Sequence, residues 1–315
     1  MKNILPEQFT SPHPLKTAVL FLIFNRLDTT KQVFEAIRKA KPPRLYIASD
    51  GPRDSSPDED NKVKAVRDYV IGHIDWDCEV KTLFREKNLG CKYAVSGAIT
   101  WFFENEEMGI ILEDDCLPHP SFFRFCEKLL ECYREDERIG IISGDNFTFG
   151  KRQTNDSYYF SRYAHIWGWA SWRRTWQKYD VRMKQWPYVK RNDLLLDILR
   201  HKKLVRYWIN IFDDVFNKKI DSWAYQLNFA CLINSMFNIM PNNNLISNIG
   251  FGDNALHTIK FNKFSAMPVS EIRFPLLHPN VIMRDALADR ITERDQFSKS
   301  LIISRIAKII KRVNV

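Results

Sequence analysis

The stretch Gly109-Ile-Ile-Leu-Glu-Asp-Asp-Cys-Leu-Pro118 runs from continuous apolar residues directly into three carboxylates, Glu113, Asp114 and Asp115, here called the acidic triplet. An apolar run without alternation is typical of a strand that is buried on both faces, as inside a parallel sheet. Three adjacent acids at the end of such a strand repel one another unless a cation lies among them. Open α/β sheets bind their ligands at this edge. We therefore expect a divalent metal here that holds a phosphorylated ligand.

Strand and helix patterns alternate through the first half of the chain. Besides the strand that ends in the acidic triplet, apolar runs predict strands over residues 17–24, 44–50, 79–86 and 139–143. Helical spacing of apolar residues predicts helices over residues 29–40, 58–74, 90–106 and 122–133. Four βα units in succession indicate an α/β fold with a Rossmann-like, mostly parallel central sheet that helices flank.

The pattern changes after about residue 150. Residues 157–176 are dense in aromatic side chains and arginine, and helices are expected over 194–216 and 222–234, before a polar loop over 242–257. Residues 298–315 predict a C-terminal amphipathic helix with an isoleucine-rich stripe between lysine and arginine side chains. Such a helix either lies on an anionic membrane surface or docks on protein, and the pattern alone does not separate the two.

The chain of 315 residues carries a formal net charge of +9, which favours an anionic partner. Nucleic acid is not expected, because the sequence has no zinc-finger spacing, no RNA-binding signature and no basic helix interleaved with aromatics. The six cysteines form no C-x-x-C pair, and residues 1–16 have no apolar core of a signal peptide. No apolar run approaches the roughly 18 residues that span a bilayer. We expect a cytoplasmic protein, with peripheral attachment to the inner face of the membrane as an alternative.

The order of these elements, with Leu112-Glu-Asp-Asp115 inside GIILEDDCLPHPSFFRFCEKLL, resembles the GT-A-fold glycosyltransferases, and most closely the N-acetylglucosaminyltransferase I-like group. The resemblance extends from about residue 17 to residue 260. It implies a UDP-sugar donor (UDP-N-acetylglucosamine is one candidate) and a divalent Mn²⁺ or Mg²⁺. The basic charge and the basic C-terminal segment favour a glycan or lipid-linked acceptor.

The resemblance also implies a division of the chain. Its parts are an N-terminal extension (1–16), a nucleotide-sugar-binding half (17–150), an acceptor-side and catalytic half of the same domain (151–297), and the basic amphipathic helix (298–315).

On the donor side, the resemblance implies roles for three residues of the first half. Arg26 resembles the family arginine that contacts the nucleotide, and Asp50 resembles the acid that reads the uracil or ribose. Asp50 is equally explained as a turn residue before Gly51-Pro52. Lys92 falls where the family has a basic residue that contacts the donor, although a histidine is expected there. Alternatively, Lys92 is a solvated surface charge that does not contact the donor.

The metal ligands implied by the resemblance are Asp115 and His257, whereas Glu113 and Asp114 would contact hydroxyls of the sugar or ribose. Oxygen ligands such as these suit Mg²⁺ or Mn²⁺, which bridge diphosphate oxygens. His257 lies in a late loop that the family folds over the diphosphate, where it would ligate the metal or bond the phosphate. The alternative for His257 is a structural role.

Asp221, in Lys-Ile-Asp-Ser-Trp-Ala (219–224), resembles the catalytic base that this group places just before a tryptophan. Such a carboxylate takes the proton of the acceptor hydroxyl while a single in-line displacement inverts the anomeric centre. The alternative is a helix cap for a helix beginning at Ser222. Trp167, Gly168 and Trp169 fall where the family shapes the sugar and acceptor sites, and their alternative is a packed aromatic core.

Two other classes of function remain open from the sequence. A sugar nucleotidyltransferase would need a glycine-rich phosphate loop after the first strand, and residues 24–28 contain no glycine. A non-catalytic relative that binds a nucleotide or a glycan is disfavoured, because a site without activity has no reason to keep both Asp115 and Asp221.

Overall fold

The computed structural model describes residues 13–152, 154–251 and 264–297, so the segments that contain His257 and the expected C-terminal helix lie outside it. The first half builds successive βα units close to the predicted ranges. Its strands are β1 (Val19–Ile23), β2 (Arg44–Ser49), β3 (Glu79–Phe84), β4 (Met108–Glu113) and β6 (Ile139–Ser143). Its helices are α1 (Leu27–Ala40), α2 (Glu59–Gly72), α3 (Gly90–Asn105) and α4 (Ser121–Cys132).

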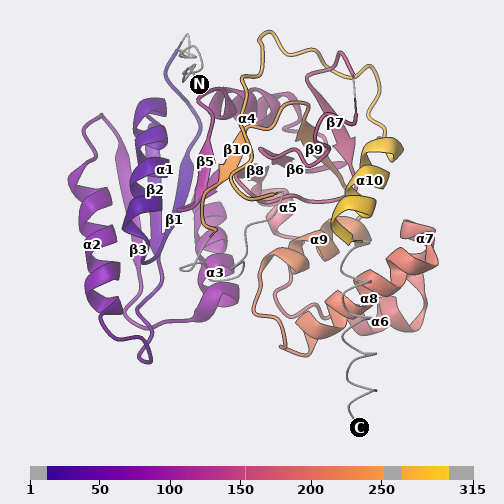
Figure 1. Cartoon of the computed structure of the whole chain (residues 1–315), viewed down its shortest axis with the longest axis horizontal. Helices are drawn as coiled ribbons and strands as arrows, with labels where there is room; N and C mark the ends of the chain where they lie inside the picture. Colours follow the sequence, from indigo (N-terminus) through magenta and orange to yellow (C-terminus); the bar gives the residue numbers. More distant parts are fainter. Residues whose placement is uncertain (1–12, 153, 252–263, 298–315) are drawn as a thin grey trace.

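The central sheet contains eight strands among the described residues, in the order β3-β2-β1-β4-β8-β6-β9-β7 (Figure 1). Neighbouring strands from β3 to β4 are parallel, and β9 (Phe237–Pro241) is parallel to β6. The exceptions are β8 (Trp169–Trp172), antiparallel to β4 and β6, and β7 (Tyr158–Ser161), antiparallel to β9. The structure therefore confirms an α/β fold with a mostly parallel central sheet flanked by helices.

The two predicted halves share this sheet, because β8 of the second half lies between β4 and β6 of the first. The helix expected over 194–216 is wrong as a single element. Arg200 adopts a left-handed conformation with φ 56°, which ends one helix and starts another at Lys202. The helices of the second half are α5 (Arg173–Trp176), α6 (Trp186–Arg191), α7 (Leu194–Leu199), α8 (Lys202–Phe216), α9 (Ala224–Ile233) and α10 (Ala286–Thr292), followed by a π-helical turn, η1 (Glu293–Phe297).

A small second sheet lies beside the acidic triplet. It pairs β5 (Cys116–Pro118) with β10 (Ile246–Asn248) in antiparallel fashion, so that Asn248 lies opposite Cys116. The polar segment that was expected to be a loop thus contains a strand. This pairing brings residues 249–251 next to the end of β4, although they are more than 130 positions away in the sequence.

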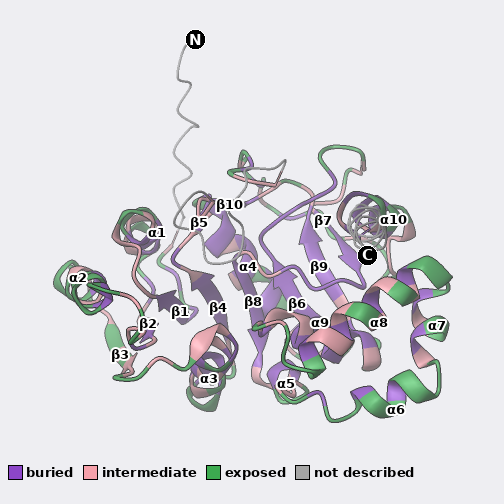
Figure 2. Cartoon of the chain, turned by 60° about the horizontal axis from the view of Figure 1, so that its bottom comes forward, coloured by how far each residue is buried: buried purple, intermediate pink, exposed green. Residues whose placement is uncertain are grey.

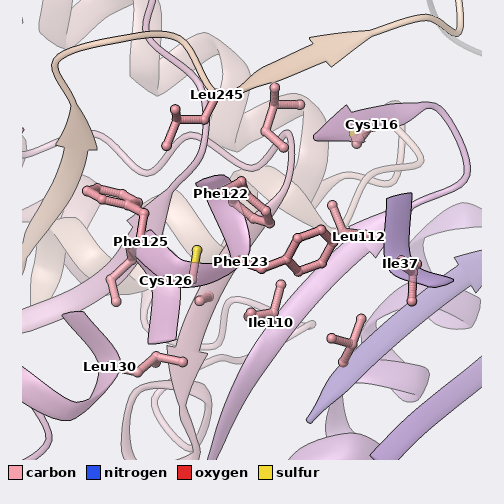
Figure 3. Close-up of a cluster of buried hydrophobic side chains, with 14 of the residues drawn as sticks. Ile37, Ile110, Leu112, Cys116, Phe122, Phe123, Phe125, Cys126, Leu130 and Leu245 are labelled. Atoms are coloured by element: carbon pink, nitrogen blue, oxygen red, sulfur yellow. The ribbon is translucent and has the colours of Figure 1, made fainter. Parts of the chain in front are cut away.

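The core explains why β4 has no apolar alternation. Ile110 and Leu112 pack with Phe122 of α4 on one face (Figure 3). Ile111 packs with Phe102 of α3 on the other face, and all five side chains are fully buried. Burial of such a side chain contributes roughly 1.5–3 kcal/mol. Figure 2 shows that most strands are buried while the outer faces of α2, α6 and α7 are exposed. None of the helices within the described ranges is long and apolar enough to cross a bilayer.

Candidate functional site

A cleft of about 970 Å³ opens at the carboxyl edge of the parallel strands. Residues that follow β1, β2, β4 and β6 line it, together with residues that precede β8 and α9. Ligands of open α/β sheets bind at this edge because the strand ends and helix N-termini leave polar groups there. Among the predicted site residues, those that line the cleft are Arg26, Asp50, Glu113, Asp114, Asp115, Trp167 and Asp221.

The acidic triplet lies at the end of β4 with one guanidinium against it. Nη2 of Arg26 forms ion pairs with Oδ1 of Asp114 and with Oδ2 of Asp115, the latter at 3.0 Å. Asp114 also accepts a hydrogen bond of 3.3 Å from the backbone N–H of Phe24, at the end of β1. Arg26 thus supplies positive charge to two of the three acids, and no ion pair between it and Glu113 is present.

Burial and mutual repulsion shift the ionisation of these groups. Burial, with the charges of Asp115 and Asp114, raises the pKa of Glu113 to about 8. Burial also raises the pKa of Asp114 to about 6, although Arg26 opposes that rise. Burial lowers the pKa of Arg26, but the charges and hydrogen bonds of Asp114 and Asp115 outweigh it and raise that pKa above its usual value. Even where Glu113 is neutral, one guanidinium therefore faces two carboxylates, those of Asp114 and Asp115.

This excess of carboxylate oxygens fits a hard divalent cation. Within the described parts of the chain, however, no group of three or more His, Cys, Asp or Glu side chains is arranged to hold a metal by itself. Mg²⁺ is commonly bound by one or two carboxylates together with substrate phosphates and waters, rather than in an all-protein cage. The residues present fit a metal of that kind, and His257, the other predicted ligand, lies outside the described residues.

Gly250 packs directly against the acidic triplet. The backbone N–H of Ile249 donates to the carbonyl oxygen of Asp115 at 2.8 Å, which holds the segment after β10 in place. A Cβ atom on Gly250 would lie 2.1 Å from Oδ2 of Asp115 and 2.6 Å from Nη1 of Arg26. Only glycine therefore fits beside this ion pair without displacing it.

Asp50 and Asp221 both hold the turn that leads into α3. Asp50 accepts hydrogen bonds from the backbone N–H groups of Leu89 and Gly90, at 3.0 and 3.1 Å, and from that of Gly51. Burial raises the pKa of Asp50, and these N–H groups partly offset the rise. The structure supports a local role for Asp50 in this turn and also exposes it to the cleft.

Asp221 reaches α3 from a distant part of the chain. It accepts hydrogen bonds from the backbone N–H groups of Cys91, at 3.1 Å, and Lys92, at 3.2 Å. It does not cap the helix that follows it, since α9 begins at Ala224 and has no side-chain cap. Asp221 therefore lines the cleft beside the turn that Asp50 also holds, and it satisfies backbone N–H groups at the N-terminus of α3.

Three predicted residues do not line the cleft. The Lys92 side chain is buried in the body of the molecule, with Nζ 5.6 Å from the centre of the Tyr93 ring. Gly168 has φ +60°, and a Cβ there would lie 2.5 Å from Cδ1 of Ile246, so this glycine serves close packing. Trp169 lies in the core, where its ring stacks on Trp223 at 5.8 Å. Trp167 precedes the first residue of β8, Trp169, and Gly168 between them has a left-handed φ of +60°, so the two tryptophans do not belong to one strand face.

Sequence reasoning missed two buried residues of the cleft, Asp145 and His165. Asp145 follows β6 as the acidic triplet follows β4, and this repeated pattern of an acid after an apolar strand was the available signal. His165 lies in the aromatic segment before β8. Nδ1 of His165 and Oδ1 of Asp145 are 3.0 Å apart.

No protein-family model matches the chain, and no curated protein matches it. Among solved structures, it is similar to the mannosyltransferase PcManGT from Pyrobaculum calidifontis in complex with GDP-Man and Mn²⁺, with a TM-score of 0.38 and 14% identity over 57% of this chain and 50% of that one. It is also similar to S. aureus TarS 1-349, with a TM-score of 0.40 and 9% identity over 74% of this chain and 60% of that one. It is similar as well to HddC from Yersinia pseudotuberculosis, with a TM-score of 0.32 and 11% identity over 50% of this chain and 77% of that one. The chain thus spans about half of the mannosyltransferase.

Proposed function

We propose that this chain is a GT-A-type glycosyltransferase that moves a sugar from a UDP-sugar to a hydroxyl of a glycan or lipid-linked acceptor. The observation that carries the proposal is the acidic triplet with Arg26 at the carboxyl edge of a mostly parallel sheet, in one cleft with Asp221. The cleft volume of about 970 Å³ is at the upper end of the range for small-molecule sites.

In this proposal the donor lies along the ends of β1, β2 and β4. Arg26 and Asp50 contact the nucleotide, and Glu113 and Asp114 contact hydroxyls of the sugar or ribose. Asp115, with His257, would hold Mn²⁺ or Mg²⁺, which when bound stabilises the charge of the departing diphosphate as a Lewis acid. The ring of Trp167 offers an aromatic face to a pyranose.

Asp221 is the proposed base. The acceptor oxygen forms a bond to C1 of the sugar, the C1–phosphate oxygen bond breaks, and the acceptor proton passes to the Asp221 carboxylate. The nucleoside diphosphate leaves from the opposite face, so the anomeric centre inverts. The exposure of Asp221 at the cleft supports this role, because an acceptor can reach it from solvent.

The test is a screen of UDP- and GDP-sugars for thermal stabilisation and donor hydrolysis, with and without Mn²⁺. Stabilisation by one nucleotide family that requires metal, together with slow hydrolysis of the sugar, supports the proposal. A sugar nucleotidyltransferase would instead release pyrophosphate from a nucleoside triphosphate and a sugar phosphate. If only that reaction occurred, the proposed transfer would be wrong.

A further inference from the structure

Asp145 and His165 form a buried hydrogen-bonded pair in the cleft. Asp145 is fully buried and His165 is 8% exposed, yet both residues line the cleft. One carboxylate oxygen lies 3.0 Å from Nδ1 of His165, and the other accepts the backbone N–H of Trp167 at 3.2 Å. A single carboxylate thus orients the imidazole and the segment that carries the Trp167 ring.

The sheet places this pair at a fixed distance from the acidic triplet. β6 and β4 are separated only by β8, so their ends lie two strand spacings apart, roughly 10 Å. The backbone N–H of Gly144, next to Asp145, donates to the carbonyl oxygen of Gly168 at 2.7 Å and fixes the two segments at this edge. The pair therefore lies within the reach of a sugar that is attached to a diphosphate at the acidic triplet.

The second ring nitrogen of His165 is unsatisfied within the described residues. Nε2 is buried and has no hydrogen-bond partner. We assign the tautomer in which Nδ1–H donates to the Asp145 carboxylate, and in that neutral ring Nε2 carries a lone pair. Buried polar groups normally have partners, and an orphan at a cleft needs an explanation such as a missing ligand.

Because Nε2 is a hydrogen-bond acceptor in this tautomer, its ligand must offer a hydrogen-bond donor. A phosphate oxygen is itself an acceptor and cannot satisfy a lone pair, whereas a sugar hydroxyl donates an O–H. The Phe147 ring packs against the imidazole, with ring centres 4.7 Å apart, and itself lines the cleft. Phe147 therefore forms part of the cleft wall beside the imidazole.

We propose that Nε2 of His165 accepts a hydrogen bond from a hydroxyl of the donor's sugar, with Asp145 as the positioning residue. This inference rests on the proposed function, since it requires a nucleotide-linked sugar in the cleft. It makes His165 a residue that distinguishes a nucleotide sugar from the bare nucleotide.

The test compares two variants of His165, each of which keeps a polar group at one of the two ring-nitrogen positions. His165→Asn keeps an N–H for Asp145 in the place of Nδ1 but has nothing at the position of Nε2. His165→Gln has a longer amide whose oxygen or nitrogen lies near the position of Nε2. Calorimetry with Mn²⁺ measures UDP against UDP-N-acetylglucosamine, and GDP against GDP-mannose, for the wild type and both variants.

We expect the affinity of the sugar conjugate, relative to its bare diphosphate, to fall about 3- to 10-fold in His165→Asn, the loss of one neutral hydrogen bond. The ratio should stay near the wild-type value in His165→Gln, and bare diphosphate should bind all three proteins equally. If the ratio is the same in all three, the inference about His165 is wrong and the proposed function stands. If the wild type binds none of the four ligands, both are wrong.

Discussion

Nη2 of Arg26 lies 3.0 Å from Oδ2 of Asp115 and is also paired with Asp114. The guanidinium therefore lies where a metal ion would also be attracted, and the two positive charges must share the same carboxylates. Without a ligand, the positive charge of Arg26 reduces the repulsion among the carboxylates of the acidic triplet. A metal ion that binds together with a diphosphate adds further positive charge to these carboxylates.

Replacement of Arg26 tests whether the guanidinium and a metal ion interact with the same carboxylates. Arg26→Met leaves the buried acids without their counter-charge, which should lower the free energy of unfolding by about 3–5 kcal/mol without metal. Mn²⁺ should then raise the melting temperature of the variant more than that of the wild type. Arg38→Met is the matched control, because its ion pair with Asp75 is exposed and far from the cleft. An equal effect of Mn²⁺ on wild type and Arg26→Met would contradict the account.

The close approach of Gly250 to Asp115 gives a second prediction. Gly250→Ala would place a Cβ against Oδ2 of Asp115 and must displace either the ion pair or the segment after β10. Displacement of a catalytic group by about 1 Å costs on the order of 100-fold in turnover. Gly72→Ala, which meets no atom within 4 Å, is the control and should leave turnover unchanged. Sugar transfer at the wild-type rate by Gly250→Ala would show that this packing is irrelevant.

The pKa values of the acidic triplet predict how stability depends on pH. The folded pKa of Glu113 is raised to about 8, so its neutral form is favoured by folding. Its contribution to stability is complete below the usual pKa of 4.5 and is lost as the pH rises through about 8. Because a cation bound at the neighbouring Asp115 favours the charged form of Glu113, stabilisation by Mg²⁺ and nucleotide should grow between pH 6 and pH 8 as Glu113 ionises.

Melting temperatures across this pH range, with and without Mg²⁺ and nucleotide, measure the effect. Glu113→Gln removes the titrating group and should flatten the curve of the ligand-free protein. A Mg²⁺ effect that decreased toward pH 8 would have the wrong sign for this account.

Replacement of Asp221 should abolish sugar transfer and leave donor binding intact. Asp221→Ala removes the acceptor of two N–H groups at the start of α3, which costs about 1 kcal/mol of stability. Loss of a general base lowers kcat about 10²- to 10⁴-fold. Stabilisation by metal and nucleotide should persist, since the proposal gives Asp221 no contact with either of them. Turnover that survived in Asp221→Ala would leave Asp221 with its structural role only.

Local pattern was sufficient for the first half of the fold. The apolar run before Glu113 predicts a strand buried on both faces, and Ile110 and Ile111 pack on opposite faces as expected. The same local rule predicts that acids after this strand lie at a ligand-binding edge.

Long-range pairing was not predictable from one sequence. The position of β8 between β4 and β6, which places Trp169 in the core, depends on pairing with strands that are distant in the sequence. Neither Asp221's contact with Lys92, 129 positions away, nor the break at Arg200 carries a local signal such as glycine or proline.

The most direct measurement is titration calorimetry of the UDP- and GDP-sugars into the wild type and Asp115→Asn, each with and without Mn²⁺. The account predicts that one nucleotide family binds the wild type, that Mn²⁺ tightens this binding at least about 10-fold, or roughly 1.4 kcal/mol, and that Asp115→Asn loses the metal-dependent part. Absence of nucleotide affinity under every condition, or a Mn²⁺ effect of the same size in Asp115→Asn, would contradict it.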